Sequence, residues 1–242
     1  MSARPSRAAL GALTAALLNA CSTAHPPAPT LPATPEARYA AVRANEDRMR
    51  SLRARFRSQA HFPTGERASD GVLLVEKPDR FRLRLFLPLG ITVFDYLSVG
   101  EQSWTSLPLA GTDERERAAQ FAPFSRTDLG ETFLRGAFAF PGQCSAAAAD
   151  DDRVLVSCRA GSTLRRTLSI GAQGIAEEIS YDDTTPRLVI RYDDYRPVDG
   201  IALPFRIALE YPQRQQRVDI SIDSYEVNPQ LAPALFQPPA TP

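Results

Sequence analysis

Apolar and polar residues alternate along most of the chain after residue 50. Between positions 52 and 62 the even positions hold apolar or small residues, while the odd positions hold Arg, Gln or His. The same period of two, or a short apolar run, occurs at 71–77, 80–85, 91–99, 102–107, 137–143, 153–159, 163–170, 174–181, 187–193, 203–211 and 217–223. Pro, Gly and Asp separate these runs. The pattern predicts eleven or twelve antiparallel strands, each with one apolar and one solvated face.

Two segments have helical character instead. Residues 36–50 are charged, rich in alanine and free of Gly and Pro, so they predict a helix after Pro35. Its apolar stripe would consist of Ala37, Ala40, Ala41 and Ala44, with Val42 and Met49 as further candidates. A second helical region, 112–136, contains Ser125-Arg126-Thr127-Asp128, which has the form of a capping box. The expected fold is therefore mainly β with covering helices, and the sheet must close into a barrel, form a sandwich or curl around the helices.

The first 35 residues differ from the rest of the chain. Arg4 and Arg7 precede an apolar stretch at 8–18, which is shorter than the roughly 20 residues of a membrane-spanning helix. This pattern predicts a signal peptide over 1–20. Leu18-Asn19-Ala20-Cys21 reads as a lipobox, with Cys21 as the acylated first residue; the alternative is an ordinary signal cleaved nearby, with an incidental thiol. Residues 21–35 would form a Pro-rich tether, and 36–239 one folded domain.

The other two cysteines form an even pair. Cys144 and Cys158 flank the run Asp150-Asp151-Asp152, which is a candidate hairpin tip. In an oxidising compartment such a pair predicts a structural disulfide. Closing a loop of about 15 residues stabilises the fold by about 3 kcal/mol in the chain-entropy model. A free or redox-active thiol pair is the alternative, although the chain has no C-x-x-C motif.

Composition and motifs favour binding over catalysis. The chain has 28 basic and 28 acidic residues, so it has no basic excess for nucleic acid. His25 falls in the tether and His61 on a polar strand face, and nucleophile-elbow, P-loop and zinc-protease motifs are missing. The acidic runs 150–152, 182–183 and 193–194 fall at predicted turns or strand ends without the spacing of a calcium loop. We expect a protein without enzyme activity, cofactor or metal; a carboxylate-pair hydrolase stays open.

Three stretches resemble the lipoprotein-localisation family, which includes the outer-membrane receptor LolB and the periplasmic carrier LolA. They are Gly71–Leu83 with its Lys-Pro-Asp-Arg turn, Leu85–Val93 with its Pro-Leu-Gly, and Asp199–Phe205 with the later Val227-Asn228-Pro229 and Leu235-Phe236. The likeness covers most of residues 36–238. It implies an incomplete, eleven-stranded antiparallel barrel with helices over its opening and an apolar interior that binds acyl chains.

The resemblance also implies where an acyl chain would bind. Candidate cavity-lining residues are Phe56, Phe81, Leu83, Leu85, Trp104, Phe205, Ile207, Leu209, Val218 and Ile220. Burying apolar area stabilises a bound chain by about 25 cal/mol per Å² without hydrogen bonds. These residues can equally pack against the helices as a solid core, and the sequence leaves both arrangements open.

With a lipid anchor, the likeness is nearest in type to the receptor. It implies a monomer anchored in the outer membrane, facing the periplasm, that receives lipoproteins or lipids from a LolA-like carrier and inserts them. In such receptors an apolar residue in a protruding loop aids insertion, and Pro88-Leu89-Gly90 matches by position, with Leu89 the first candidate and Leu87 the second. A tight turn whose leucines fold under a helix is the alternative for this loop. A structural lipoprotein that docks an envelope or secretion partner without binding lipid is the alternative for the protein.

Overall fold

The structure, a computed structural model, describes residues 30–108, 143–149, 152–182 and 185–238. Helix α1 spans Pro35–Arg48, and the strands are β1 (Ser51–Phe62), β2 (Gly65–Glu76), β3 (Arg80–Leu87), β4 (Ile91–Val99), β5 (Gln102–Ser106), β6 (Gln143–Ala148), β7 (Val154–Ala160), β8 (Thr163–Ile170), β9 (Ile175–Asp182), β10 (Thr185–Val198), β11 (Ile201–Tyr211) and β12 (Gln216–Val227). Short 3-10 helices are η1 (Pro88–Gly90), η2 (Pro212–Arg214) and η3 (Pro233–Phe236). The predicted helix at 112–136 and nearly all of the predicted strand at 137–143 lie outside the described residues.

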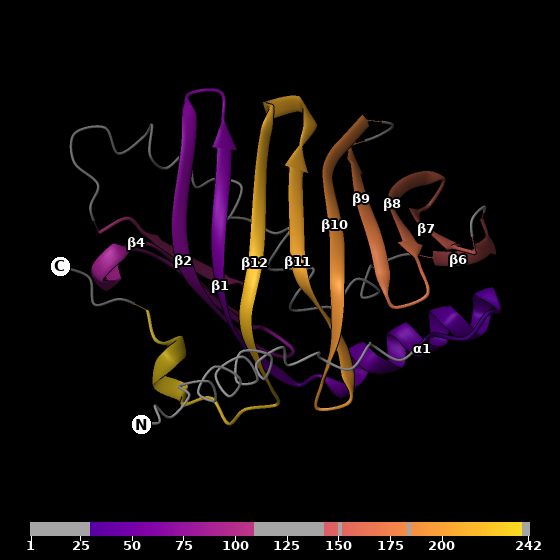
Figure 1. The fold of residues 1–242 in the computed structure, drawn as a ribbon, viewed down its shortest axis with the longest axis horizontal. Helices are drawn as coiled ribbons and strands as arrows, with labels where there is room; N and C mark the ends of the chain where they lie inside the picture. Colours follow the sequence, from indigo (N-terminus) through magenta and orange to yellow (C-terminus); the bar gives the residue numbers. More distant parts are fainter. Residues whose placement is uncertain (1–29, 109–142, 150–151, 183–184, 239–242) are drawn as a thin grey trace, which may run out of the picture.

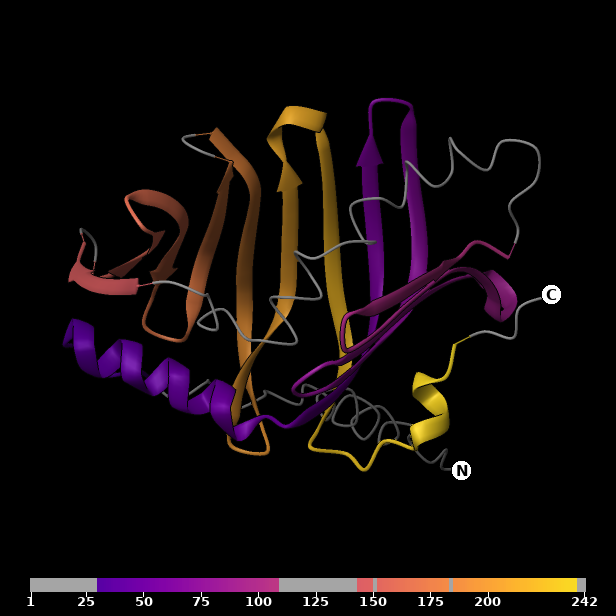
Figure 2. The ribbon, with the colours of Figure 1, turned by 180° about the vertical axis from the view of Figure 1, so that it is seen from behind.

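All twelve strands belong to one antiparallel sheet. Its order is β5-β4-β3-β2-β1-β12-β11-β10-β9-β8-β7-β6, so among the described residues β5 and β6 are its edges and the sheet is open. Figures 1 and 2 show that the sheet curls, with β3 to β5 turning across the face of β1 and β12, while α1 runs along one end beneath β10 to β6. The prediction of a mainly β, incomplete antiparallel barrel is confirmed. In the described part of the chain, no helix has the length and apolar character needed to cross a membrane.

The inner face of the sheet is apolar, as the alternation predicts. A main inner cluster joins side chains of β1–β4 with those of β10–β12; Leu52, Phe81, Leu85, Phe94 and Ile190 in it are each at most 1% exposed. A second inner cluster lies where α1 meets β7–β9 and includes Val42, Val156, Leu168 and Ile170. Tyr192 packs against both clusters. The two clusters therefore meet at Tyr192.

The outer face is not polar throughout. Leu74 and Leu97 of this face are covered by Leu231 and Phe236 from the C-terminal segment, which includes η3. This outer cluster explains why Arg82 is buried, although the alternation in β3 places Arg82 on the face that was predicted to be solvated. The Arg82 guanidinium forms a two-point ion pair with Asp95, at 2.7 and 2.9 Å, and donates to the Leu235 carbonyl at 2.7 Å.

The buried face of α1 matches the expected one only in part. The buried residues of the helix are Arg38 and Val42, and the helix contacts β6 and β7. Val42 and Met49 of the predicted stripe are buried, but Ala37, Ala40 and Ala44 are exposed. An alanine side chain buries little apolar area, so the longer Arg38 and Val42 determine which face turns inward.

Charged side chains hold both ends of α1. Arg38 donates from Nε to the Pro32 carbonyl at 2.8 Å, and from its other nitrogens to the backbone and side chain of Asp152. At the far end of the helix, Lys77 Nζ donates to the Glu46 carbonyl at 2.8 Å. Burial of Lys77 lowers the pKa of its ammonium group. Through its contacts with Pro32 and Asp152, Arg38 links the end of the predicted tether to the hairpin of β6 and β7.

Candidate functional site

A cavity of about 110 Å³ lies between α1 and strands β10 and β11. Its lining residues are Val42, Asn45, Glu46, Met49, Gln173, Gly174, Ile175, Tyr192, Tyr195, Ile201, Ala202, Leu203 and Pro204. Met49 and Leu203 belong to the main inner cluster, while Val42 and Ile175 belong to the second. The cavity therefore lies at the junction of the two apolar clusters, under the helix. Its wall is mostly carbon.

The two tyrosines of the cavity wall donate hydrogen bonds from their hydroxyls to other groups of the protein. Tyr195 donates to the Ile175 carbonyl at 2.7 Å, and Tyr192 donates to the Glu178 carboxylate at 3.3 Å. Burial raises the pKa of both phenols, and for Tyr192 the nearby Glu178 charge raises the pKa further. Both hydroxyls thus stay protonated and act as donors, so the rings present carbon to the cavity.

Behind Tyr192 the inner face carries a buried ion pair. Arg166 Nε lies 3.1 Å from Glu178 Oε1, and the Glu178 side chain is only 1% exposed. A buried pair of this kind needs close partners, because removing charges from water is costly. Sequence reasoning missed the pair. Glu178 is the second of two adjacent glutamates, so alternation alone does not show which of them turns inward.

The ten predicted lining residues lie elsewhere than in this cavity. Eight are buried in the main inner cluster: Phe56, Phe81, Leu83, Leu85, Ile207, Leu209, Val218 and Ile220. Phe205 is half-buried; its ring packs edge-on against Tyr225, with centroids 5.2 Å apart, and the Arg196 guanidinium lies 4.4 Å from its centroid. The placement of Trp104 in an interior cavity was wrong. It pairs with Leu97 and packs in the outer cluster, because its register places it on the opposite face from Tyr96.

The turn between β3 and β4 exposes apolar side chains. Leu89 is 98% exposed, Leu87 is 38% exposed and Ile91 is 46% exposed. The backbone of Leu89 has φ of 71°, in the left-handed region that costs a bulky residue energy. In Figures 1 and 2 this turn, the short magenta helix η1, lies at the opposite side of the molecule from α1. The structure thus does not fold Leu89 under a helix.

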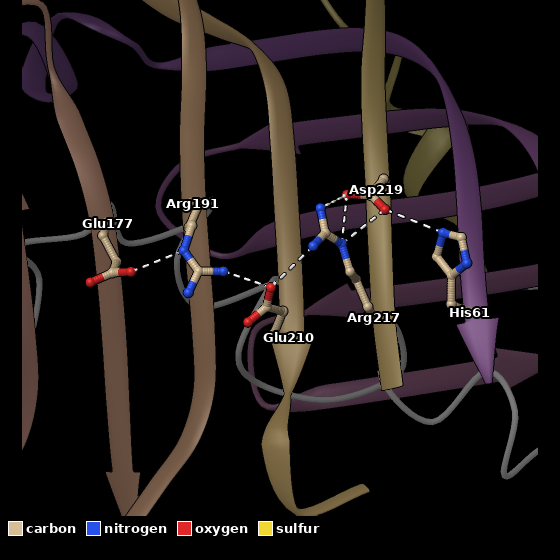
Figure 3. Close-up of polar contacts among 6 residues, drawn as sticks. All are labelled: His61, Glu177, Arg191, Glu210, Arg217 and Asp219. Atoms are coloured by element: carbon tan, nitrogen blue, oxygen red, sulfur yellow. Dashed lines mark hydrogen bonds and ion pairs between the residues drawn. The ribbon is translucent and has the colours of Figure 1, made fainter. Parts of the chain in front are cut away.

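The outer face of β9–β12 and β1 carries a row of alternating acidic and basic residues (Figure 3). The row consists of Glu177, Arg191, Glu210, Arg217, Asp219 and His61. Successive contacts measure 3.1 Å for Glu177–Arg191, 2.6 Å for Arg191–Glu210, 3.3 Å for Glu210–Arg217, 2.7 Å for Arg217–Asp219 and 3.3 Å for Asp219–His61. Exposed ion pairs contribute about 0–1 kcal/mol each to the stability of the fold. The main effect of this row is therefore to make the outer face polar.

His61 lies at one end of this row, on the polar strand face as predicted. Its Nε2 faces Asp219, and its Nδ1 lies 3.2 Å from Glu66 Oε1. Because each ring nitrogen faces a carboxylate, neither is open toward a substrate hydroxyl. Among the described residues, no group of three or more His, Cys, Asp and Glu side chains is placed to hold a metal ion.

The acidic runs were only partly understood from the sequence. The prediction that 193–194 falls at a turn or strand end was wrong, because both residues lie within β10. There Asp194 has φ of 56° and pairs with Arg196 at 2.6 Å.

The predicted disulfide between Cys144 and Cys158 is confirmed. Cys144 of β6 and Cys158 of β7 are direct cross-strand partners and form a disulfide. The bridge fastens an edge hairpin of the sheet, and Cys158 packs in the second inner cluster. Cys21, the predicted lipidation site, and His25 lie outside the described residues.

Comparisons with known proteins identify the fold. Neither a family model nor a curated protein matches the sequence. Among solved structures, a DUF1329 family protein from Desulfovibrio piger has a TM-score of 0.60 at 15% identity, covering 81% of this chain and 97% of that one. A LolA superfamily protein from Nitrosomonas europaea has a TM-score of 0.57 at 13% identity, covering 82% and 97%. A Vibrio parahaemolyticus protein domain, described as outer membrane lipoprotein-sorting, has a TM-score of 0.56 at 10% identity, covering 82% and 94%. The chain therefore has a LolA-like fold.

Proposed function

We propose that this protein is a lipoprotein anchored in the outer membrane through Cys21, which binds acyl chains inside its half-barrel and passes lipoproteins or lipids to the membrane. The LolA-like fold supports this proposal, as does the structural similarity to a lipoprotein-sorting domain from Vibrio parahaemolyticus. The two apolar clusters of the inner face, with a cavity under α1 at their junction, are suited to hydrocarbon because a chain needs no hydrogen-bond partner there.

The observation that carries the proposal is the exposed turn at Leu89. A leucine that is 98% exposed, flanked by two further exposed apolar residues, is unfavourable in water unless it meets a membrane or a partner. Its left-handed backbone adds a cost of about 1–3 kcal/mol, and strain of this kind is concentrated at functional sites. A protein that inserts lipids into a membrane needs such a protruding apolar tip.

We propose that the protein acts by binding and has no enzyme activity. Both nitrogens of His61 are engaged by carboxylates, and the two cavity tyrosines hold their protons. The partners in this proposal are acyl chains of lipoproteins or phospholipids and a LolA-like carrier in the periplasm. A monomer suffices, because one chain contains the inner face, the cavity and the tip.

Mass spectrometry of lipids extracted from the natively purified protein tests the proposal. We expect phospholipid or lipopeptide to co-purify, and to be transferred to liposomes on mixing. A lipid-free protein that co-purifies with a stable envelope or secretion partner would contradict the proposal and favour the assembly lipoprotein. In that case, binding of a fluorescent fatty acid to the purified protein without the partner is measured. Binding would show an acyl site that was empty on purification, and no binding would show that the protein does not bind acyl chains.

A further inference from the structure

We propose that the cavity under α1 holds the methyl end of a single straight acyl chain, and that Tyr195 determines how far the chain enters. This inference rests on the proposed function and specifies it, because it states which part of a lipid is recognised and which residue sets the limit. The argument depends on the size of the cavity, on the chemistry of its wall and on the way the Tyr195 ring is held.

The cavity is too small to enclose a large ligand. Its volume is about 110 Å³. Ligand pockets that enclose a drug-sized molecule measure about 300–1,000 Å³. A sterol or two chains side by side would therefore not fit inside it, but the end of one linear chain would.

The wall of the cavity offers carbon, not hydrogen-bonding groups, on its sheet side. Ile201, Leu203 and Ile175 line it with side chains that have no polar atoms. Tyr192 directs its hydroxyl to Glu178, away from the cavity. Polar side chains of the lining, apart from the tyrosines, come from α1 and from the turn between β8 and β9. A ligand segment that binds against the sheet must therefore be apolar, because an unpaired polar group there would lose its hydration.

The Tyr195 ring is held in place from two sides. Its hydroxyl donates to the Ile175 carbonyl at 2.7 Å, which fixes the far end of the ring. Its near side lies against Gly174, where a Cβ atom would stand 2.5 Å from two ring carbons. Glycine at 174 is thus required for the ring position. A ring held at both its hydroxyl and its face acts as a fixed end wall, in contrast to a freely rotating side chain.

A series of straight-chain fatty acids, each one methylene longer than the last, tests the inference. The protein begins at residue 21 and carries Cys21→Ser, so that neither the signal peptide nor an attached lipid competes. Binding is read by displacement of a fluorescent fatty acid. For the wild-type cavity we expect affinity to rise about fourfold for each added methylene until the chain reaches Tyr195, and then to level off. Tyr195→Ala should move this limit to longer chains. Tyr195→Phe, which keeps the ring but loses its hydrogen bond to Ile175, should shift the limit less than Tyr195→Ala.

Two glycines of one turn provide a matched pair. Gly174→Ala should push the Tyr195 ring into the cavity and shift the limit to shorter chains. Gly171→Ala should have no such effect, because a Cβ there meets its nearest atoms at 3.9 Å. Thermal unfolding confirms that each variant is folded, and the Gly174→Ala result decides the matter if Tyr195→Ala does not fold.

The outcomes separate the two proposals. If fatty acids bind but wild type, Tyr195→Ala and Gly174→Ala share one length limit, the role of Tyr195 is wrong and acyl binding stands. If no fatty acid of any length binds the wild-type cavity, acyl binding itself is wrong.

Discussion

Phe56 of β1 and Gly71 of β2 are direct cross-strand partners, and the Phe56 ring occupies the space that a Cβ at position 71 would need. Phe56 is 5% exposed and belongs to the main inner cluster. The glycine lets the ring lie flat against the strand. At this point of the sheet, the packing of the interior therefore depends on a residue without a side chain.

Gly71→Ala should destabilise the fold by about 1–3 kcal/mol, because overpacking forces the Phe56 ring or the backbone to move. Thermal or urea unfolding measures the loss. In the Gly71→Ala background, Phe56→Leu should recover part of it by removing the ring. Equal stability of wild type and Gly71→Ala would show that the ring has room to shift.

The ion pair of Arg82 and Asp95 should matter far more than an exposed pair. Asp95→Ala leaves the Arg82 guanidinium, 7% exposed, without its carboxylate, and we expect a loss of about 3–5 kcal/mol. The matched control is Glu226→Ala, which breaks the more exposed pair with Arg53 and should cost about 0–1 kcal/mol. Urea unfolding followed by Trp104 fluorescence measures both, because Trp104 packs in the same outer cluster. If Asp95→Ala and Glu226→Ala lower the free energy of unfolding equally, the Arg82–Asp95 pair does not contribute more than an exposed pair.

Three buried phenols should make the fold sensitive to alkali. Burial raises the pKa of Tyr192, Tyr195 and Tyr225 above the ordinary value of 10.0. Above pH 10 the unfolded chain releases these protons while the folded chain keeps them, so the free energy of unfolding falls as pH rises. Each such phenol contributes a slope of about 1.4 kcal/mol per pH unit. The contribution is fully present below pH 10.

Urea unfolding at a series of pH values measures this slope. Tyr195→Phe and Tyr225→Phe should each make the fall above pH 10 shallower, even if they lower stability at neutral pH by removing a hydrogen bond. A slope that stays the same in both variants would mean that these phenols ionise normally in the fold.

The strand pattern was predictable because it depends on a local, two-residue period. In β1 the even positions are buried from Leu52 to Ala60, as the alternation predicts. The beginning of β2 was missed because residues 65–70 contain no large apolar residue. That segment is held by pairing with β1, including a 2.8 Å contact between the hydroxyls of Ser58 and Ser69. Such pairing depends on the partner strand and leaves no apolar signal in the segment itself.

The cavity was less predictable than the sheet. The alternation identified eight inner residues correctly as interior, but it does not distinguish a packed position from a cavity wall. The wall of the cavity under α1 depends on where the helix lies, and the helix is held by the contacts of Arg38 with the Asp152 carbonyl and of Lys77 with the Glu46 carbonyl. The position of Tyr195 depends on a glycine 21 residues earlier in the chain. Long-range contacts of this kind have no local pattern.

The anchor at Cys21 stays a prediction from the sequence. Cys21→Ser should leave an unprocessed precursor or release the protein from membranes, because the acyl chains would be missing. Fractionation of membranes and the mass of the mature protein measure this. Cys144→Ser, which breaks the disulfide but not the lipobox, is the control and should stay in the membrane fraction. A Cys21→Ser protein with normal mass in the membrane fraction would contradict lipidation.

Leu89 allows function and stability to be separated. Leu89→Gly removes the apolar side chain and also relieves the left-handed strain, so it should raise the free energy of unfolding by up to about 1–2 kcal/mol. The same variant should transfer less lipidated cargo to liposomes if the side chain enters the membrane. Leu89→Glu should transfer less still, with little change in stability, because the residue is 98% exposed.

A leucine elsewhere on the surface serves as the control for this experiment. Leu155 of β7 is 40% exposed, so Leu155→Glu adds the same charge far from the turn and should leave transfer unchanged. If Leu89→Glu unfolds at a much lower temperature than wild type, Leu89 stabilises the fold and the insertion role is wrong. If Leu89→Gly is more stable but transfers as well as wild type, the strain at this turn has another cause. Only a variant that is more stable yet less active would show that the strained, exposed leucine is maintained for its action on membranes.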